Sequence, residues 1–181
     1  LSRGLYQYKP DLPFSPGGEV AGVVRSAPDG AHVRAGDRVL GLTMITGGMA
    51  EVVVLPPDRV FPLPANVSFE AGAGVLFNDL TVQFALRTRG RLMPGETVLV
   101  HGAAGGIGTS TLRMAGPLGA ARTIAVVSTE EKVDVAKAAG AVDVVCKPSN
   151  DNALTDMAVA LVDAVRSAWH ARGRLNRPLP T

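Results

Sequence analysis

The sequence predicts an α/β protein in which a β-rich part precedes a parallel sheet. Up to about residue 66, short strand-like runs alternate with turns, as in a small barrel or sandwich. From residue 97 onward, apolar runs of strand length alternate with stretches of helical periodicity, and this β-α-β-α-β order requires a parallel sheet. With 181 residues and 46% hydrophobic content, the chain can form one ordinary domain or two small ones.

The β-rich part contains three predicted strands, Glu19 to Val24, Arg38 to Leu42 and Ala50 to Leu55. Turn-forming residues separate them, including Pro28-Asp29-Gly30 and Gly47-Gly48. Short strands with this much turn chemistry predict a small antiparallel assembly.

Two helices are predicted to connect the β-rich part to the parallel sheet. Ser68, followed by Glu70 and an alanine-rich stretch, can start a short helix. A second helix is predicted over Asp79 to Arg87. The turn Met93-Pro94-Gly95 then leads into the first parallel strand.

The parallel part has three predicted strands and two predicted helices between them. In chain order they are strand Val98 to His101, helix Ile107 to Met114, strand Ile124 to Val127, helix Glu130 to Ala139 and strand Val142 to Cys146. Gly116-Pro117 should end the first helix, because proline lacks the backbone N–H and clashes with the preceding turn.

The most informative motif is TVLVHGAAGGIG, from Thr97 to Gly108. A glycine turn between a strand and a helix lets the backbone approach a pyrophosphate, and the helix directs its unpaired N–H groups at the anion. Ala103 stands where the first glycine of the dinucleotide motif is expected, and Gly105 and Gly108 are the second and third. The alternative is a tight turn that binds no ligand.

The end of the second parallel strand indicates which dinucleotide is preferred. An acidic residue there would bind the ribose 2′-hydroxyl of NAD, but this chain has Ser128, with Thr129 next and Lys132 one turn later. A hydroxyl and an ammonium suit the 2′-phosphate of NADP. In the alternative, Ser128 and Glu131 form a capping box, Lys132 is an ordinary surface residue, and NAD remains open.

Composition excludes several other classes of function. The charge is only +2, no apolar run approaches a membrane span of roughly 20 residues, and there is no signal-peptide core, so a cytoplasmic location is expected. One cysteine, Cys146, and three scattered histidines predict no metal site. Cys146 lies in a predicted strand and is expected to be inert.

Residues 150–181 are predicted to form a helix and a basic tail. Apolar residues between Leu154 and Trp169 repeat on one helix face. The tail carries no aromatic interleaving, which favours a solvated end over a nucleic-acid site. Its basic residues are Arg166, Arg172, Arg174 and Arg177.

Four stretches give the chain a resemblance to the zinc-free quinone oxidoreductases of the medium-chain dehydrogenase/reductase superfamily. They are RGLYQYKPDLPFSPGGEVAGVV (3–24), GDRVLGL (36–42), FPLPANVSFEAGA (61–73) and PGETVLVHGAAGGIG (94–108). The resemblance implies a partial GroES-like catalytic domain over 1–75 and the first half of a Rossmann NADP-binding domain over 76–149. The relation of 150–181 to the family is open.

One departure from the wider superfamily has a chemical consequence. Zinc-dependent members carry a histidine ligand in a GHE motif, whereas this sequence reads Gly17-Gly18-Glu19. Without a Lewis acid, the electrophile must already be activated. The resemblance therefore implies hydride transfer from NADPH to a quinone or α,β-unsaturated carbonyl. The alternatives are an enoyl reductase acting on acyl thioesters and a non-catalytic nucleotide-binding or interaction module.

The resemblance also implies roles for individual residues. Thr81 corresponds to a position near the nicotinamide, Tyr6 to an aromatic residue of the substrate cleft, and Lys147 to a tyrosine near the adenosine phosphate. Asn78 and Asp79 replace small or aromatic residues, so the substrate side of the cleft is expected to differ. The cofactor-binding residues are Thr81, Ala104, Gly105, Gly106, Ile107, Gly108, Ser128 and Lys132.

The chain begins without a methionine inside the family's barrel region and is expected to be a fragment. The strand Val98 to His101 would then lie at an unpaired sheet edge. On this basis the chain alone is expected to bind NADP weakly and turn over poorly. Family members commonly form dimers, which makes a homodimer an expectation from the resemblance.

Overall fold

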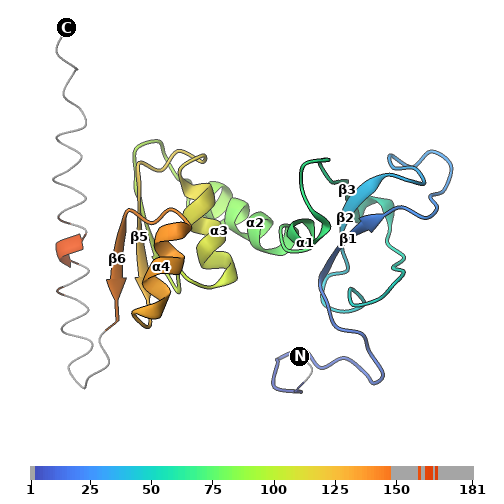
Figure 1. Ribbon diagram of the computed structural model, residues 1–181, viewed down its shortest axis with the longest axis horizontal. Helices are drawn as coiled ribbons and strands as arrows, with labels where there is room; N and C mark the ends of the chain where they lie inside the picture. The colour runs from blue at the N-terminus through green and yellow to red at the C-terminus, as the bar shows by residue number, and fades with distance from the viewer. Residues whose placement is uncertain (1–2, 148–158, 160–161, 165, 167–181) are drawn as a thin grey trace, which may run out of the picture. The chain divides into compact units, whose positions relative to one another are not determined.

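The computed structural model describes residues 3–147, 159, 162–164 and 166. The chain divides into two compact units, Leu1–Leu80 and Thr81–Thr181 (Figure 1). Each unit has its own sheet, antiparallel in the first and parallel in the second. The two predicted kinds of sheet are therefore confirmed.

The first unit contains a three-stranded antiparallel sheet in the order β1-β2-β3. Its strands are β1 (Glu19–Val23), β2 (Arg38–Leu42) and β3 (Val60–Pro62). β1 and β2 agree with the sequence prediction to within one residue.

The prediction of a strand over Ala50 to Leu55 was wrong. This segment is irregular, and its exposure alternates, with Val54 93% exposed. A run of β-branched residues forms a strand only where a neighbouring strand completes the hydrogen-bond ladder, and none of the described strands pairs with it. The chain instead continues through a short 3₁₀ turn, η1 (Pro57–Arg59), to β3.

A small core supports this sheet. Leu40, Leu63 and Leu76 are buried together. The predicted short helix is α1 (Phe69–Gly72), and the Ser68 hydroxyl accepts a hydrogen bond from the Ala71 N–H at 3.2 Å. This N-cap confirms the sequence signal at Ser68.

The next helix, α2, covers Leu76–Gln83 and continues into a π-helical turn, η2 (Phe84–Arg89). It begins three residues before the predicted start at Asp79. The Phe77 N–H donates to Glu19 Oε2 at 3.1 Å. A carboxylate here satisfies one of the first-turn N–H groups that the helix cannot pair itself.

The second unit contains the parallel sheet β4-β5-β6, as predicted. The strands are β4 (Thr97–His101), β5 (Arg122–Val127) and β6 (Asp143–Cys146), and the helices between them are α3 (Gly106–Ala115) and α4 (Glu131–Ala138). α3 ends directly before Gly116-Pro117, as expected for a helix that meets proline.

Both faces of this sheet carry buried residues. On one face, Leu112 of α3 and Ala136 of α4 pack with Val100, Ala125 and Val127. A second buried cluster consists of Ile124, Val126 and Val145, with Ala164 packed against it.

The C-terminal prediction can be followed only in part. Residues 159, 162–164 and 166 are helical, which agrees with the helix expected there. The rest of the predicted helix and the basic residues Arg172, Arg174 and Arg177 lie outside the described residues.

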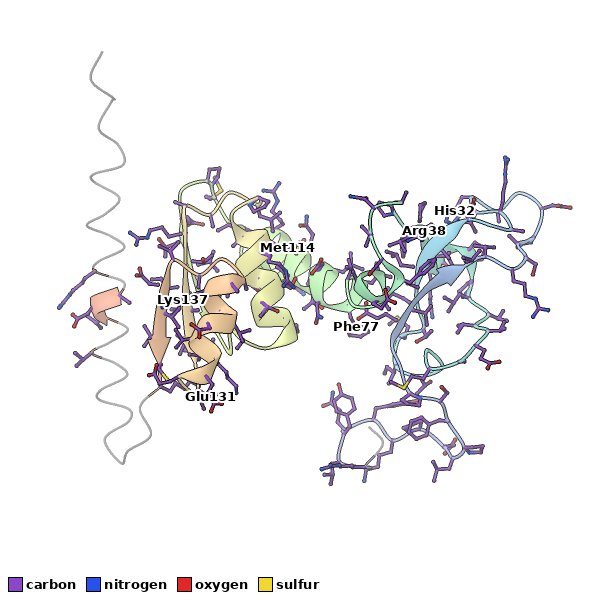
Figure 2. The ribbon with its side chains drawn as sticks, viewed as in Figure 1. His32, Arg38, Phe77, Met114, Glu131 and Lys137 are labelled. Carbon is purple, nitrogen blue, oxygen red and sulfur yellow. The ribbon has the colours of Figure 1, made fainter. Side chains whose placement is uncertain are left out.

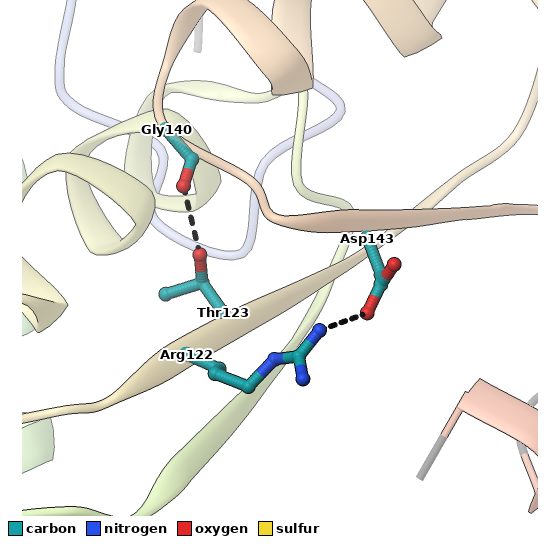
Figure 3. A network of polar contacts seen from close by, with 4 residues as sticks. All are labelled: Arg122, Thr123, Gly140 and Asp143. Carbon is teal, nitrogen blue, oxygen red and sulfur yellow. Dashed lines mark hydrogen bonds and ion pairs between the residues drawn. The ribbon is translucent and has the colours of Figure 1, made fainter. Parts of the chain in front are cut away.

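Two polar contacts tie β5 to β6 and to the turn before it (Figure 3). Arg122 Nη2 forms an ion pair with Asp143 Oδ2 at 3.1 Å, and the Thr123 hydroxyl donates to the Gly140 carbonyl at 2.9 Å. Gly140 has φ +105°, a conformation that favours glycine. These contacts fix where β6 starts, and so place its carboxyl end beside that of β5.

Within the described part of the chain, every helix is too short or too polar to cross a membrane. The same residues contain no group of three or more His, Cys, Asp or Glu side chains able to hold a metal ion.

Candidate functional site

The turn after β4 is built on Gly102, which has φ +64°. Its carbonyl accepts from the Gly105 N–H at 2.9 Å, while the Ala103 N–H donates to the Val126 carbonyl at 3.1 Å. Ala103 is fully buried. The conformation that needs glycine therefore falls on Gly102, a residue that the sequence analysis missed. Its signal was a glycine placed directly after the last strand residue.

The first turn of α3 presents backbone N–H groups. Gly105 is the N-cap and makes no side-chain capping bond. Gly105 and Gly106 are exposed, and Ile107 is 49% exposed. Since the first N–H groups of a helix have no partner within it, those of Gly106, Ile107 and Gly108 form a site suited to an anion.

Gly108 has a different role in the same turn. A Cβ added to it would overlap the carbonyl oxygen of Gly102 and would lie 2.6 Å from the Cα of Ala103. Gly108 is buried, and Ala104 is half-buried. The glycine therefore allows α3 to lie directly against the turn, as the third glycine of a dinucleotide motif does.

Ser128 and Lys132 come together at the carboxyl end of β5. Lys132 Nζ donates to Ser128 Oγ at 2.9 Å, and both residues are exposed. α4 begins at Glu131, and its N-cap, Glu130, makes no side-chain capping bond. The capping-box alternative for Ser128 is therefore not formed, and its hydroxyl is paired with an ammonium group instead.

The end of β6 lies beside this pair in the sheet. The Lys147 N–H donates to the Val127 carbonyl at 2.9 Å, so Lys147 follows β6 next to the end of β5. Desolvation raises the pKa of the Cys146 thiol, and the neighbouring Glu130 carboxylate raises it further by a hydrogen bond and by its charge. The thiol is thus protonated at neutral pH, as expected for an inert cysteine.

Gly18 occupies a closely packed position in the first unit. A Cβ added there would lie 2.8 Å from the Met44 carbonyl oxygen and 3.3 Å from Phe77 Cε2. The Gly18 carbonyl in turn accepts from the N–H groups of Thr43 and Met44, at 3.0 and 3.2 Å. The first atom of any side chain at position 18 would therefore press on this carbonyl and on the aromatic ring.

Of the remaining predicted residues, three lie on α2 and Tyr6 lies in the N-terminal segment. Tyr6 is half-exposed in the irregular N-terminal segment of the first unit. Asn78 and Asp79 lie in α2, and the Asn78 side chain donates to the Gly74 carbonyl at 3.4 Å. Thr81 is exposed on the same helix and begins the second unit.

Comparison with known proteins identifies both parts of the chain. Residues 1–65 match the alcohol dehydrogenase GroES-like domain. Quinone oxidoreductase of Mus musculus is 39% identical over 116 residues, which are 64% of this chain and 35% of that protein. The crystal structure of a probable oxidoreductase from Mycobacterium abscessus superposes with a TM-score of 0.79 at 40% identity, covering 93% of this chain and 51% of that one.

A second solved structure is similar over most of the chain. Escherichia coli quinone oxidoreductase, solved as a complex with NADPH, has a TM-score of 0.72 and 38% identity, covering 82% of this chain and 45% of that one. Over most of its own length, the chain is similar to quinone oxidoreductases. The expected GroES-like and Rossmann-like parts are both confirmed. The chain spans between 35% and 51% of the length of these three relatives.

Proposed function

We propose that this chain binds NADPH and takes part in hydride transfer to a quinone or an α,β-unsaturated carbonyl compound without a metal ion. The observation that carries the proposal lies in one parallel sheet, where the exposed turn before α3 and the Ser128–Lys132 pair follow neighbouring strands. Dinucleotides bind outside the carboxyl ends of such strands. The relative solved with NADPH supports the same cofactor.

The residues of the turn fit a pyrophosphate. Gly105 is exposed, and a Cβ added to it would come within 4 Å of only one atom, the Gly102 carbonyl oxygen, at 3.3 Å. The backbone from Ala104 to Gly106 is thus open to a close approach. The N–H groups of the first turn of α3, together with its positive dipole end, would hold the anion.

The 2′-phosphate of NADP would be held by the Ser128 hydroxyl and the Lys132 ammonium. No carboxylate stands at Ser128, the position at which an acidic residue would bind the ribose of NAD and repel a phosphate. Lys147 supplies a second ammonium at the same edge of the sheet, after the neighbouring strand.

NADPH, when bound, supplies the hydride, and the chain supplies position and electrostatics. Thr81 and Tyr6 are proposed, from their places in the family, to lie near the nicotinamide and the acceptor. Gly18 has no side chain with which to bind zinc, and a Cβ added there would lie 2.8 Å from the Met44 carbonyl oxygen. The acceptor must therefore be an electrophile that needs no Lewis acid, such as a quinone.

The domain organisation is proposed in the same terms. Residues 1–75 would form the GroES-like part and residues 76–149 the first half of the NADP-binding domain. Assembly into a homodimer stays a prediction from the family.

Thermal unfolding with added nucleotides tests the cofactor assignment. A ligand at a hundred times its Kd stabilises the folded state by about 2.7 kcal/mol, which is easily seen as a rise in Tm. We expect NADPH to raise the Tm of the 181-residue chain more than NADH does at equal concentration. Equal shifts would overturn the roles of Ser128 and Lys132, and no shift with either nucleotide would overturn NADPH binding.

Quinone reduction tests the reaction itself. Oxidation of NADPH by the chain with duroquinone should proceed equally with and without a chelator such as EDTA, because no side chain is available at Gly18 to hold zinc. A rate that EDTA abolishes and zinc restores would contradict the metal-free mechanism. Replacing duroquinone with an enoyl thioester would reveal the alternative enoyl reductase.

A further inference from the structure

An aromatic ring and a glycine backbone lie against each other in the first unit. Phe77, labelled at the start of α2 in Figure 2, is 45% exposed. Its ring lies close enough to Gly18 that an added Cβ would be 3.3 Å from Cε2. Its backbone N–H is bound to the Glu19 carboxylate at 3.1 Å. Glu19 follows Gly18 in sequence, so the same short segment contacts both the ring and the backbone of Phe77.

The other side of Gly18 is formed by a strained loop. Met44 has φ +78°, a left-handed conformation that non-glycine residues seldom adopt, and its N–H and that of Thr43 both donate to the Gly18 carbonyl. The side chains of Met44 and Ile45 are 48% and 40% exposed. Backbone strain of this kind is found preferentially at ligand sites, because the surrounding bonds must maintain it.

We propose that the Phe77 ring, beside Gly18 and the Met44 carbonyl, is the platform on which the planar ring of the acceptor lies. The proposal rests on the proposed function and names the acceptor class more closely. Aromatic rings stack on one another with a gain beyond that of buried area, whereas a flexible acyl chain has no ring with which to gain it. Phe77 therefore selects a quinone over an acyl thioester.

The residue at position 18 decides whether the Phe77 ring stays accessible. A side chain at position 18 would collide with the Met44 carbonyl and press on the ring, so glycine is required for the platform to stay open.

The test measures binding of duroquinone to the isotopically labelled chain by NMR. Duroquinone is fully methylated and cannot add to the Cys146 thiol by substitution at a ring C–H. We expect the amide signals of Gly18 and Met44 to shift on titration. Phe77→Leu, which keeps an apolar side chain but removes the ring, should weaken binding about fivefold, as expected for losing a stacking interaction of about 1 kcal/mol.

Two control variants accompany Phe77→Leu. Phe77→Tyr retains the ring face and should bind duroquinone as the unchanged chain does. Phe61→Leu removes another partly exposed phenylalanine of the same unit, on β3, and should have no effect. The platform would be contradicted if Phe77→Leu bound duroquinone as tightly as the unchanged chain does. It would also be contradicted if duroquinone left the amide signals of Gly18 and Met44 unshifted.

Separate measurements of NADPH binding and of duroquinone binding distinguish failure of the proposed function from failure of this inference. NADPH affinity, measured by nucleotide fluorescence, should be unchanged in Phe77→Leu. If the chain binds no NADPH but still binds duroquinone at Gly18 and Phe77, the cofactor assignment falls and the platform stands. If NADPH binds and duroquinone does not, the platform falls and the cofactor assignment stands.

Discussion

Lys132 Nζ donates a hydrogen bond to Ser128 Oγ at 2.9 Å, one helical turn after β5 ends. The hydroxyl is thereby oriented by a cation rather than by the helix terminus, whose N-cap is Glu130. An exposed ammonium beside a hydroxyl forms a binding point for a dianionic phosphate, because both groups can donate to its oxygens. We base the proposed preference for NADP over NAD on this pair.

Lys132→Gln should lower NADPH affinity about tenfold and leave NADH affinity nearly unchanged. A charge-assisted hydrogen bond contributes about 1.5 kcal/mol, and NADH has no 2′-phosphate with which to make it. Nucleotide fluorescence titrations measure both affinities. The matched control is Lys137→Gln, which removes the same charge at the other end of α4 from Glu131 (Figure 2). An equal loss of NADH affinity in Lys132→Gln would contradict the assignment.

Glu19→Gln should destabilise the first unit modestly, and Glu19→Ala should do so more. The carboxylate accepts from the Phe77 N–H in the first turn of α2, where a negative charge also interacts favourably with the helix dipole. The expected losses are about 0.5 and about 1 kcal/mol. Urea unfolding measures them, with Glu51→Gln, an exposed carboxylate in an irregular segment, as the control. Equal stability of Glu19→Ala and Glu51→Gln would show that the contact contributes nothing.

Gly18→Ala should destabilise the chain by about 1–3 kcal/mol, since its Cβ would lie 2.8 Å from the Met44 carbonyl oxygen. Gly22→Ala is the matched control within β1, because no heavy atom lies within 4 Å of its added Cβ. It should be neutral or slightly stabilising. Urea midpoints for the two variants measure the difference. Gly18→His should likewise lose stability and bind no zinc, and zinc-dependent stabilisation of that variant would contradict the packing argument.

The elements that could be predicted from sequence are those set by neighbouring residues. β4, α3 and β5 follow from apolar runs and periodicity, and the end of α3 follows from Gly116-Pro117. β3, only three residues long and ending in Pro62, leaves too short a pattern to detect. The start of α2 depends on Glu19, which lies 58 residues before Phe77 in the chain, so no local signal marks it.

The residues of the candidate site also fall into those that could be predicted from the sequence and those that could not. Gly105 and Gly108 were predicted because the glycine motif places them where β4 leads into the first turn of α3, and Ser128 and Lys132 because they follow the next strand, β5. Gly102 was missed because its role depends on a backbone angle, which the letters GAAGG do not specify. Phe77 was missed because its proposed role depends on the contact of its ring with Gly18, and only folding of the first unit brings these two residues together.

Cys146 should react slowly with iodoacetamide at neutral pH. Desolvation raises the pKa of its thiol above the usual value near 9.0, and the Glu130 carboxylate raises it further. The thiolate, which is the reactive form, is therefore scarce until the pH rises well above neutral. Glu130→Gln removes the repelling charge and should speed alkylation at pH 8, and Glu131→Gln is the control on the next residue. A rate matching that of an unfolded cysteine would contradict the shift.

Because the folded chain raises this pKa, it favours the protonated thiol, and the sign of the stability effect follows. The contribution of the Cys146 thiol to the free energy of unfolding is fully present below the pKa that this thiol has in the unfolded chain. It is lost as the pH rises through the pKa that the thiol has in the folded chain. Cys146→Ser should therefore flatten the fall in stability on the alkaline side of pH 8.5, as measured by urea unfolding at several pH values.

Gly108→Ala should abolish NADPH binding through a shift of α3 rather than through loss of a contact. Its Cβ would overlap the Gly102 carbonyl oxygen and would lie 2.6 Å from the Cα of Ala103, so the helix must move away from the turn. The N–H groups of the first turn would then no longer converge on one anion. Gly116→Ala is the matched control at the other end of α3, since it meets open space and has a helical conformation. Circular dichroism should show both variants folded, with only Gly108→Ala failing to gain Tm from NADPH. Full stabilisation of a folded Gly108→Ala chain by NADPH would mean that the cofactor does not depend on this turn.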